Sequence, residues 1–354
     1  MDTKLILAVA GSGKTRHLIE NLSLERRAII LTYTINNTEN LRKRVIQKFG
    51  FLPNNIRIHT YFSFLYQFCF QPLYQDASQS KGISFKSAPP RDWRKKSDVT
   101  HYFIPKVSIL YANRLAKFFL EFDPDGLSCV KQRFEKYFDD MFVDEFQDFA
   151  SYDFDFICEL AKTRVQCQFV GDYHQHTFDT SRDGQFKKNL HVSEDRFLAE
   201  VRKHGVEIDT TTLGKSYRCS PSVASFVRDS LGIEMGSQRQ DETNIVFVED
   251  QTETINLLKN DDVIKLVYQN SKKMDFFSMN WGASKGLDDF HDVCIILNKK
   301  QFEQTQNLKA QEMNQKTLKK LYVACTRAKG DIFFVKDQII KEIARDGKAF
   351  LNRV

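Results

Sequence analysis

Long apolar runs and closely spaced cysteines are scarce in this chain of 354 residues. No apolar run approaches the roughly 20 residues of a membrane-spanning helix. The run of residues 5–10 follows Lys4 but is too short for a secretory signal, because it ends in Gly-Ser-Gly-Lys-Thr. The seven cysteines are scattered and form no Cys-x-x-Cys pair, which is typical of small buried residues in a reducing cytosol. We therefore expect a cytoplasmic protein without a membrane partner.

Charge of either sign is also not in large excess. Lysine and arginine exceed aspartate and glutamate by 52 to 46, which gives a net charge of +6. This permits a nucleic-acid partner without requiring one, since an ordinary solvated surface explains it equally well. Residues 81–117 are locally richer in basic and aromatic side chains, which suits single-stranded nucleic acid, although a structural role is about as probable. These side chains are Lys86, Arg91, Trp93, Arg94, Lys95, Lys96, Tyr102, Phe103, Lys106 and Arg114.

The length and a hydrophobic content of 42% suit a soluble protein with two domains. Apolar runs alternate with helical patterns, which favours an α/β fold with parallel sheets. We expect strands at 5–9, 28–33, 56–58, 141–143, 168–170 and 207–213, with helices at 15–21 and 39–49. A second sheet domain is expected to have strands at 245–248, 263–267, 276–279, 293–297 and 332–335, with helices near 221–231 and 316–326. The predicted domains are 1–70 with 138–213, a small helical insertion at 71–137, and 214–354.

A glycine-rich turn follows the first apolar run. Its residues are Ala10, Gly11, Ser12, Gly13, Lys14 and Thr15, preceded by Ala8-Val9 and followed by a helical pattern. Backbone N–H groups can turn inward there because the two glycines lack a Cβ atom. We expect Lys14 to reach the β and γ phosphates of a nucleotide and the Thr15 hydroxyl to bind Mg²⁺. Ala8 stands where the usual pattern has glycine.

Two further polar segments follow apolar strands. In the first, Asp144 is expected to hold Mg²⁺ and Glu145 to orient and deprotonate an attacking water. An ordinary acidic turn is the alternative. In the second, Gln175 can sense the γ phosphate, and Phe178 offers a ring face for stacking. Carboxyl ends of parallel strands meet at one sheet edge, where open α/β sheets bind ligands.

These segments occur in the order found in UvrD/Rep/PcrA-type superfamily 1 helicases, which the chain resembles over nearly its whole length. The matching motifs are Ala-x-Ala-Gly-Ser-Gly-Lys-Thr (8–15), Thr-Tyr-Thr (32–34), Thr-Tyr-Phe-Ser-Phe (60–64), Asp-Glu-Phe-Gln-Asp (144–148), Gly-Asp-x-x-Gln (171–175), Tyr-Arg-Cys (217–219), Ser-Lys-Gly-Leu (284–287) and Leu-Tyr-Val-Ala-Cys-Thr-Arg-Ala-Lys (321–329). The resemblance implies two RecA-like domains of the P-loop NTPase class, with ATP and Mg²⁺ bound between them.

The resemblance also assigns residues to the nucleotide. Arg218 and Arg327 would reach the γ phosphate, Tyr217 would stack on the adenine, and Arg16 would contact it. As alternatives, Tyr217 could be a core aromatic and Arg327 a cation that caps a helix. The segment with Gly286 and Asp288 would contact the ribose, with Asp289 as the alternative to Asp288.

Single-stranded DNA would lie across the tops of both domains, on hydroxyls for phosphates and rings for bases. The candidate residues are Tyr33, Thr34, Thr60, Tyr61, Phe62, Phe178 and Trp281. Tyr33, Thr60 and Phe178 are the main candidates, because many of the 31 phenylalanines must belong to the core. Trp281 is included because Gly282 replaces a histidine of the family and Trp281 could supply the lost contacts.

Three other departures bear on function. The glutamine motif of the family has no counterpart before residue 5, and Asp179 and Thr180 follow Phe178 where a second aromatic is usual. Only residues 219–284 separate Arg218 from Lys285, which leaves no room for the large helical insertion of the family's second domain. Because prying open a duplex needs a wedge, we expect DNA-dependent ATP hydrolysis and stepping more than unwinding.

The sequence therefore predicts an ATP-dependent, UvrD-like DNA helicase or single-stranded DNA translocase, 3′-to-5′ by resemblance. Its compact form also resembles the helicase-like subunits of Gabija-type anti-phage systems, which act beside a nuclease, so a nuclease partner is a further expectation. The alternative is a module that senses ATP and DNA and switches a partner without stepping. A phosphotransferase is disfavoured by the paired arginines and the Asp-Glu-x-Gln-Asp segment. The oligomeric state is left open.

Overall fold

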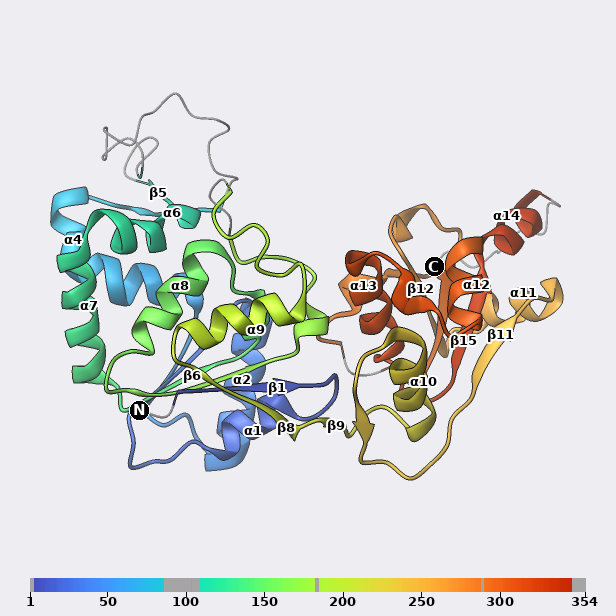
Figure 1. The fold of residues 1–354 in the computed structure, drawn as a ribbon, viewed down its shortest axis with the longest axis horizontal. Coiled ribbons are helices and arrows are strands. Elements are labelled where there is room, and N and C mark those ends of the chain that lie inside the picture. Colours follow the sequence, from blue (N-terminus) through green and yellow to red (C-terminus); the bar gives the residue numbers. More distant parts are fainter. Residues whose placement is uncertain (1–2, 86–102, 104–108, 182–184, 288–289, 346–354) are drawn as a thin grey trace. The chain divides into compact units, whose positions relative to one another are not determined.

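The computed structural model describes residues 3–85, 103, 109–181, 185–287 and 290–345, and they form two compact units (Figure 1). Unit 1 contains residues 3–7, 14–171 and 178–209, and unit 2 contains 8–13, 172–177 and 210–345 within this part of the chain. The two short segments 8–13 and 172–177 thus pack with the second half of the chain. The sequence-based boundary at 213/214 differs slightly from this contact-based one.

Unit 1 is built on a six-stranded sheet in the order β3 (Ile56–Thr60), β2 (Ala28–Thr32), β6 (Asp140–Val143), β7 (Gln166–Gly171), β1 (Lys4–Ala8) and β8 (Glu207–Leu213). The strands from β3 to β1 in this order pair in parallel, with Leu5 beside Phe169 and Ile30 beside Phe142. The expected α/β class is confirmed. Every residue of β2 is buried, as its continuous apolar run predicts for a strand covered on both faces.

Helices cover both faces of this sheet. They are α1 (Lys14–Glu20), α2 (Ile35–Phe49), α8 (Ser151–Leu160) and α9 (Glu194–Lys203). Right-handed crossovers that lead in opposite directions along the sheet place α1 and α2 on one face and α8 and α9 on the other (Figure 1). The helix boundaries follow the sequence: Thr34 caps α2, Gly50 ends it at φ 80°, and Ser193 caps α9.

The described part of the segment between β3 and β6 is mostly helical, as expected. It contains α3 (Tyr61–Ser63), η1 (Phe64–Phe70), α4 (Gln71–Ser78), β4 (Gly82–Ser84), β5 (Ile109–Tyr111), α6 (Ala112–Lys117), η2 (Phe118–Phe122) and α7 (Pro124–Tyr137). Both η1 and η2 are π-helices. The rings of η1 pack against those of α7, and Phe68 contacts Phe134 at a centroid distance of 6.4 Å.

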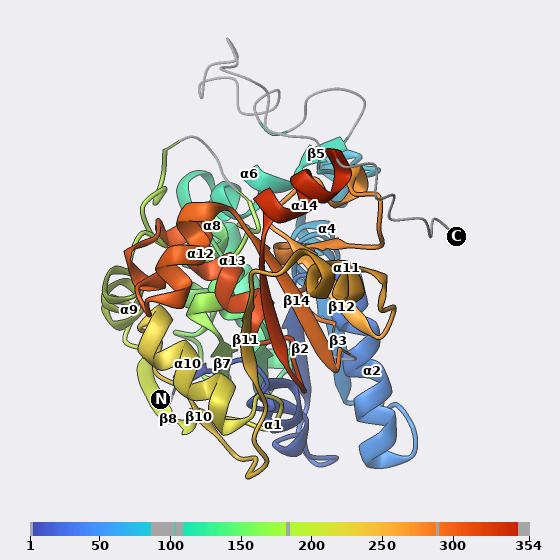
Figure 2. The same ribbon diagram turned by 90° about the vertical axis from the view of Figure 1, so that its right-hand side faces the viewer.

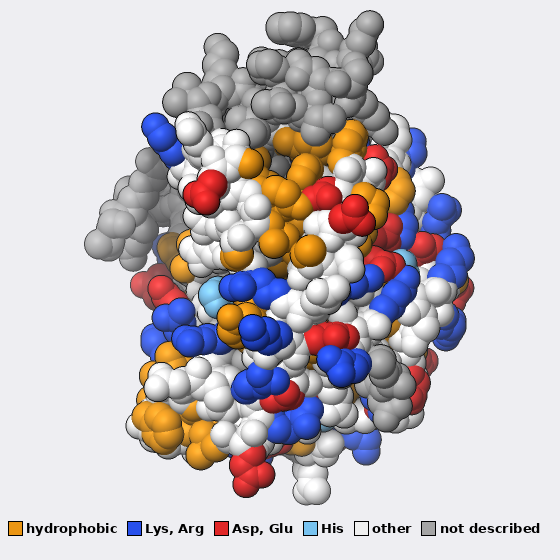
Figure 3. Space-filling model, turned by 90° about the vertical axis from the view of Figure 1, so that its left-hand side faces the viewer, with side chains coloured by type: hydrophobic (Ala, Val, Ile, Leu, Met, Phe, Trp, Pro, Cys, Tyr) orange, Lys and Arg blue, Asp and Glu red, His pale blue; other side chains and the backbone are white. Residues whose placement is uncertain are grey.

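Most of the basic stretch at 81–117 lies outside the described residues. Two of its described cations, Arg114 and Lys117, are only 5% exposed. For these two side chains the structure favours the alternative of a structural role over a nucleic-acid contact at the surface. Figure 3 shows the face of unit 1 on the side of α7, where lysine and arginine side chains are spread below a hydrophobic strip.

Unit 2 contains a second parallel sheet, in the order β11 (Ile245–Val248), β15 (Ile332–Lys336), β14 (Asp292–Leu297), β12 (Val263–Val267) and β13 (Met279–Asn280). A short pair joins β9 (Lys215–Ser216) and β10 (Gly236–Ser237). The strand expected at 276–279 is wrong in extent, because only Met279 and Asn280 pair with β12.

The helices of unit 2 are α10 (Pro221–Leu231), α11 (Gln251–Lys259), α12 (Lys299–Gln306), α13 (Gln315–Cys325) and α14 (Asp337–Arg345). Residues of β14 alternate between two cores: Ile295 packs with α10, α12 and α13, and Ile296 with α11 and α14 (Figure 2).

Short 3₁₀ turns are η3 (Phe146–Asp148), η4 (Tyr173–Gln175), η5 (Ser271–Lys273), η6 (Trp281–Ser284) and η7 (Ala310–Glu312). In the described part of the chain, no helix has the length and apolar character that crossing a membrane requires.

Candidate nucleotide and nucleic-acid sites

The glycine-rich turn leaves the end of β1 and leads into α1 at Lys14. Gly11 and Gly13 have φ angles of 71° and 86°, in the left-handed region that side chains with a Cβ avoid. Ser12 is 2% exposed, and its hydroxyl oxygen has no hydrogen-bond partner among the described residues. A buried turn with an unsatisfied hydroxyl fits a polar ligand such as a phosphate.

Within unit 2, the first half of this turn lies against the segment of Tyr217 and Arg218. The Tyr217 N–H donates to the Gly11 carbonyl at 2.8 Å. A Cβ atom at Gly11 would lie 2.6 Å from Cβ of Arg218 and 2.7 Å from Oγ of Ser216. Only glycine fits at this position, for backbone and for steric reasons.

Tyr322 was not singled out from the sequence, although it lies in the Leu-Tyr-Val-Ala-Cys motif. Its hydroxyl accepts from the Ala10 N–H at 2.9 Å and donates to Oδ2 of Asp172 at 3.0 Å. Burial and the neighbouring Asp172 raise the pKa of Tyr322 well above its usual value, so the phenol keeps its proton. Tyr322 therefore joins the glycine-rich turn to the start of η4.

Gln175 and Arg327 come together in unit 2. Nη2 of Arg327 donates to Oε1 of Gln175 at 3.3 Å, and Nε2 of Gln175 donates to Oδ2 of Asp172 at 2.9 Å. Arg327 is 2% exposed and also donates from Nε to the Val323 carbonyl in the last turn of α13. Arg327 thus contacts Gln175, the candidate γ-phosphate sensor. It also contacts the end of α13, as expected from the alternative in which Arg327 caps a helix.

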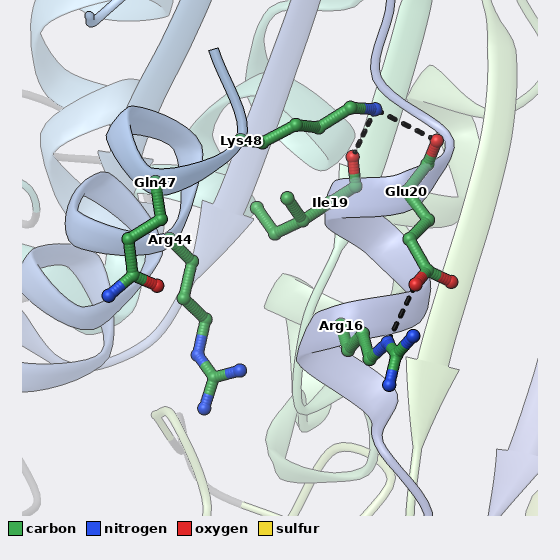
Figure 4. A pocket seen from close by; sticks show the side chains of 6 residues that line it. All are labelled: Arg16, Ile19, Glu20, Arg44, Gln47 and Lys48. Atoms are coloured by element: carbon green, nitrogen blue, oxygen red, sulfur yellow. Dashed lines mark hydrogen bonds and ion pairs between the residues drawn. The ribbon is translucent and has the colours of Figure 1, made fainter. Parts of the chain in front are cut away.

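The two residues assigned to adenine lie on the surface. Tyr217 is 60% exposed, so the alternative of a core aromatic is wrong. Arg16 pairs with Glu20 at 2.6 Å and lines a pocket of about 340 Å³ between α1 and α2 (Figure 4). On the other side of this pocket, Lys48 donates to the carbonyls of Ile19 and Glu20 at the end of α1.

Asp144 and Glu145 lie at the carboxyl end of β6. Because β1 and β6 are parallel members of one sheet, these carboxylates share an edge with Lys14 and Thr15. Asp144 is 3% exposed and accepts from the Glu145 N–H at 3.0 Å. Glu145 has a φ of 57°, a strained conformation for a residue with a Cβ, and strain of this kind clusters at functional sites.

An aromatic cluster of Tyr33, Phe62 and Phe178 lies near the same edge of unit 1. The ring of Tyr33 is 5.5 Å from that of Phe178 and 6.2 Å from that of Phe62. Phe178 is 40% exposed and offers a ring face to solvent, whereas Phe62 is 4% exposed. Thr34 and Thr60 cap α2 and α3 through their side chains, accepting from the N–H groups of Asn37 and Ser63.

Three of the proposed DNA contacts need correction. Tyr61 is completely buried, and its hydroxyl donates to Oδ1 of Asp153 at 3.0 Å. Trp281 is completely buried, and its indole N–H donates to the Leu266 carbonyl at 3.1 Å. Phe62 is almost as buried, so all three serve the core and present no open ring to a base. Their places in or beside matching motifs suggested a DNA contact, but a motif does not show which of its rings are buried.

Asp153 is a second residue that sequence reasoning missed. It is completely buried in unit 1 and accepts hydrogen bonds from Tyr61, Thr180 and Ser181. Burial raises the pKa of Asp153 to about 7, although these hydrogen bonds oppose the rise. The Thr180 carbonyl accepts from the Tyr33 hydroxyl at 3.3 Å, so Asp153 lies beneath the aromatic cluster.

In the ribose segment, Gly286 has a φ of 83°, and apart from its chain neighbours no atom of the described residues lies within 4 Å of where a Cβ would stand. Asp288 and Asp289 lie outside the described residues.

Comparison with known proteins gives a fold but no family. No protein-family model and no curated protein matches the chain. Solved structures do match it. Arterivirus nonstructural protein 10 (helicase) in complex with DNA has a TM-score of 0.51 at 13% identity, over 96% of this chain and 62% of that one. A crystal structure of Arterivirus nonstructural protein 10 (helicase) has a TM-score of 0.47 at 14% sequence identity, over 96% of this chain and 61% of that one. The PRRSV helicase has a TM-score of 0.47 at 14% sequence identity, over 95% of this chain and 52% of that one.

This chain therefore spans between about half and three-fifths of the length of those helicases. Their sequence identity is too low to carry over residues or activities. With its two parallel-sheet units, the chain has a helicase-like fold built from RecA-like domains.

Proposed function

We propose that this protein hydrolyses a nucleoside triphosphate, ATP by resemblance, and that single-stranded DNA stimulates the reaction. The observation that carries the proposal is the turn at Gly11 and Gly13, whose positive φ angles precede Lys14 and Thr15. A buried Ser12 hydroxyl without a partner among the described residues adds a polar group suited to phosphate.

Each residue of the site has a proposed role. Lys14 binds the phosphates as a point charge, and Glu145 accepts a proton from the attacking water. Thr15 and Asp144 are oxygen ligands of the kind that Mg²⁺ prefers, and they would hold that ion. The ion would neutralise phosphate charge.

Two arginines of the proposed site belong to unit 2. Arg218 and Arg327 would stabilise charge on the transferred phosphoryl group. The hydrogen bond from Arg327 to Gln175 supports this role, because it links an arginine candidate to a γ-phosphate-sensor candidate. Tyr217 of unit 2 and Arg16 of unit 1 are exposed and remain proposed adenine contacts. Gly286 and Asp288 remain proposed ribose contacts.

For the DNA strand, we propose a contact surface made of Tyr33, Phe178, Thr34 and Thr60 in unit 1. The exposed ring of Phe178 suits stacking on a base without sequence preference. One protein of this fold was solved in complex with DNA, which is consistent with such a partner.

The finer assignment rests on the sequence motifs. We propose a UvrD-type motor of 3′-to-5′ sense that works in the cytoplasm, with a Gabija-like role beside a nuclease as an extension. A module that senses ATP and DNA without stepping is the second candidate. It is favoured by residues 219–284, which fold into the sheet, helices and turns of unit 2 and form no separate lobe.

The test is ATP turnover with and without single-stranded DNA. We expect Lys14→Ala to abolish stimulated turnover, and Glu145→Gln to reduce it about 10²-fold or more while nucleotide binding is retained. Glu25→Gln is the matched control, since Glu25 is an exposed glutamate outside the site. Wild-type protein that neither binds nor hydrolyses a nucleoside triphosphate would contradict the proposal.

A further inference from the structure

A second pocket in unit 1 lies at the outer edge of the six-stranded sheet. It encloses about 500 Å³, which is enough for one nucleotide, and is bounded by the edge strand β3, by η1 and by α7. Its lining includes three arginines, Arg27, Arg57 and Arg133, and the rings of Phe68, Tyr137 and Phe138. The proposed function uses none of these residues.

Arg133 is the most informative of them. Its guanidinium carbon lies 4.9 Å from the ring centre of Phe68 and 4.8 Å from that of Tyr137. Its Nε is buried and has no hydrogen-bond acceptor among the described residues, and none of their carboxylates pairs with it. The two rings hold the guanidinium in place, so its donors are pre-organised for an acceptor that enters the pocket.

The charge of the pocket is positive. Arg27 is neutralised by Asp139, to which its Nε and Nη2 donate at 3.0 and 2.6 Å. Arg57 is exposed on β3, and within the described chain no carboxylate pairs with it. Two guanidinium groups thus remain for an anion, and charge-assisted bonds from arginine to phosphate are strong.

The pocket also offers groups for a base. Tyr137 is 45% exposed. Asn55 donates from Nδ2 to the carbonyls of Ser23, Leu24 and Arg26, which fixes its amide and leaves Oδ1 as an acceptor. His59 lies on β3, and its pKa is lowered by burial and by the nearby charges of Arg57 and Arg42.

The position separates this pocket from the glycine-rich turn. Arg27 and Asn55 immediately precede β2 and β3, so the pocket begins at the amino ends of these strands. The turn, Asp144 and Glu145 lie at the carboxyl ends, across the sheet. A ligand here would not compete for the phosphate site.

We propose that this pocket binds one nucleotide of a single-stranded nucleic acid, at a site additional to the aromatic cluster. Arg57 and Arg133 hold the phosphate, the Tyr137 ring stacks on the base, and Oδ1 of Asn55 accepts from a base N–H. A single strand is favoured over a duplex because stacking on Tyr137 needs an exposed base face.

The test is photocross-linking of a thymine oligonucleotide that carries 5-iodouracil, with the linked peptides identified by mass spectrometry. We expect a cross-link on Tyr137 or Phe68 that falls at least tenfold in Arg57→Gln and in Arg133→Gln. Arg133→Lys, which keeps the charge but loses the planar fork, should give a partial loss. Arg196→Gln is the control, because it removes one exposed arginine of unit 1 outside the pocket.

Circular dichroism checks that each variant is folded. If Arg133→Gln does not fold, Arg57→Gln still tests the proposal, because Arg57 is exposed on an edge strand. Competition by thymidine monophosphate as strong as by the unlabelled oligonucleotide would assign the pocket to free nucleotides, and weaker competition would assign it to strands. The absence of a cross-link at Tyr137 and Phe68, or one unchanged in both Gln variants, would overturn the proposal. ATP turnover is measured separately, so failure here is distinguishable from failure of the proposed function.

Discussion

At the scale of single residues, Asp153 gives a pH dependence with a definite sign. Its pKa is raised from 3.8 to about 7 by burial, so the folded state holds its proton more tightly than the unfolded state does. Protonated Asp153 therefore makes its whole contribution to the free energy of unfolding below about pH 4, and this contribution is lost as the pH rises to about 7. The loss is of the order of 1.4 kcal/mol per pH unit in that window.

We expect Asp153→Asn to flatten this part of the pH profile. Asparagine has nearly the same shape, stays neutral, and can still hydrogen-bond to Tyr61 and Thr180. Urea unfolding at pH 5 and pH 7.5 measures the difference between variant and wild type, with Asp125→Asn as the exposed control. Equal pH slopes for wild type and Asp153→Asn would show that the buried carboxyl does not titrate in this range.

Phe178 and Trp281 separate a surface ring from a core ring. Phe178→Ala should weaken single-stranded DNA binding by about 1–3 kcal/mol with little change in stability, because an exposed stacking ring is removed. Trp281→Ala should instead cost about 3–5 kcal/mol of stability, because it opens a cavity in unit 2. Fluorescence anisotropy with a labelled strand and urea unfolding distinguish the two. Phe277→Ala controls for loss of an exposed phenylalanine, and unchanged affinity in Phe178→Ala would contradict the proposed contact.

At the scale of elements, the turn between β1 and α1 can be compared with the end of α2. Both contain a glycine at positive φ, Gly11 at 71° and Gly50 at 80°, but only Gly11 has close neighbours. Gly11→Ala should therefore reduce nucleotide affinity at least tenfold. Gly50→Ala should cost only about 1 kcal/mol of stability and leave affinity unchanged. Equilibrium binding of a fluorescent ATP analogue checks this, and equal affinities for the two variants would refute the role of the turn.

Many elements could be predicted because their signals are local. The continuous apolar run Ile29-Ile30-Leu31 indicated a strand covered on both faces, and all three residues are completely buried. The helix expected near 221–231 runs from Pro221 to Leu231, and Ser220 caps its start while Gly232 ends it. The strand at 276–279 was overestimated, since an apolar run does not reveal which residues find a pairing partner.

The site was less accessible to sequence reasoning where contacts are distant in the chain. The link from Ala10 through Tyr322 to Asp172 joins three remote segments, and a single sequence gives no sign of it. For Trp281 the sequence suggested a DNA contact that the structure does not support. A tryptophan inside a matching motif looked available to a base, whereas the packing that buries it comes from strands on both sides of it in the sequence.

At the scale of the whole molecule, the interval between Arg218 and Lys285 predicts what the motor can do. Its residues form α10, β11, α11, β12 and shorter elements of unit 2, with no additional lobe. We expect ATP-driven displacement of streptavidin from a biotinylated single strand, but much slower separation of a duplex, at least tenfold below the stepping rate. Glu145→Gln is the inactive control. DNA-stimulated hydrolysis without displacement would instead support the sensing module, and efficient unwinding would contradict the prediction.

The π-helix η1 has a consequence for how the chain tolerates change in length. Each residue added to or removed from a helix turns everything beyond it by about 100°. In η1 most of this rotation is absorbed, because shortening Phe64–Phe70 by one residue would convert its wide π-helical turns to ordinary α-helical ones. The same deletion in α7, which has no wide turn to convert, would rotate Phe134 away from Phe64 and Phe68 and misalign that wall of rings.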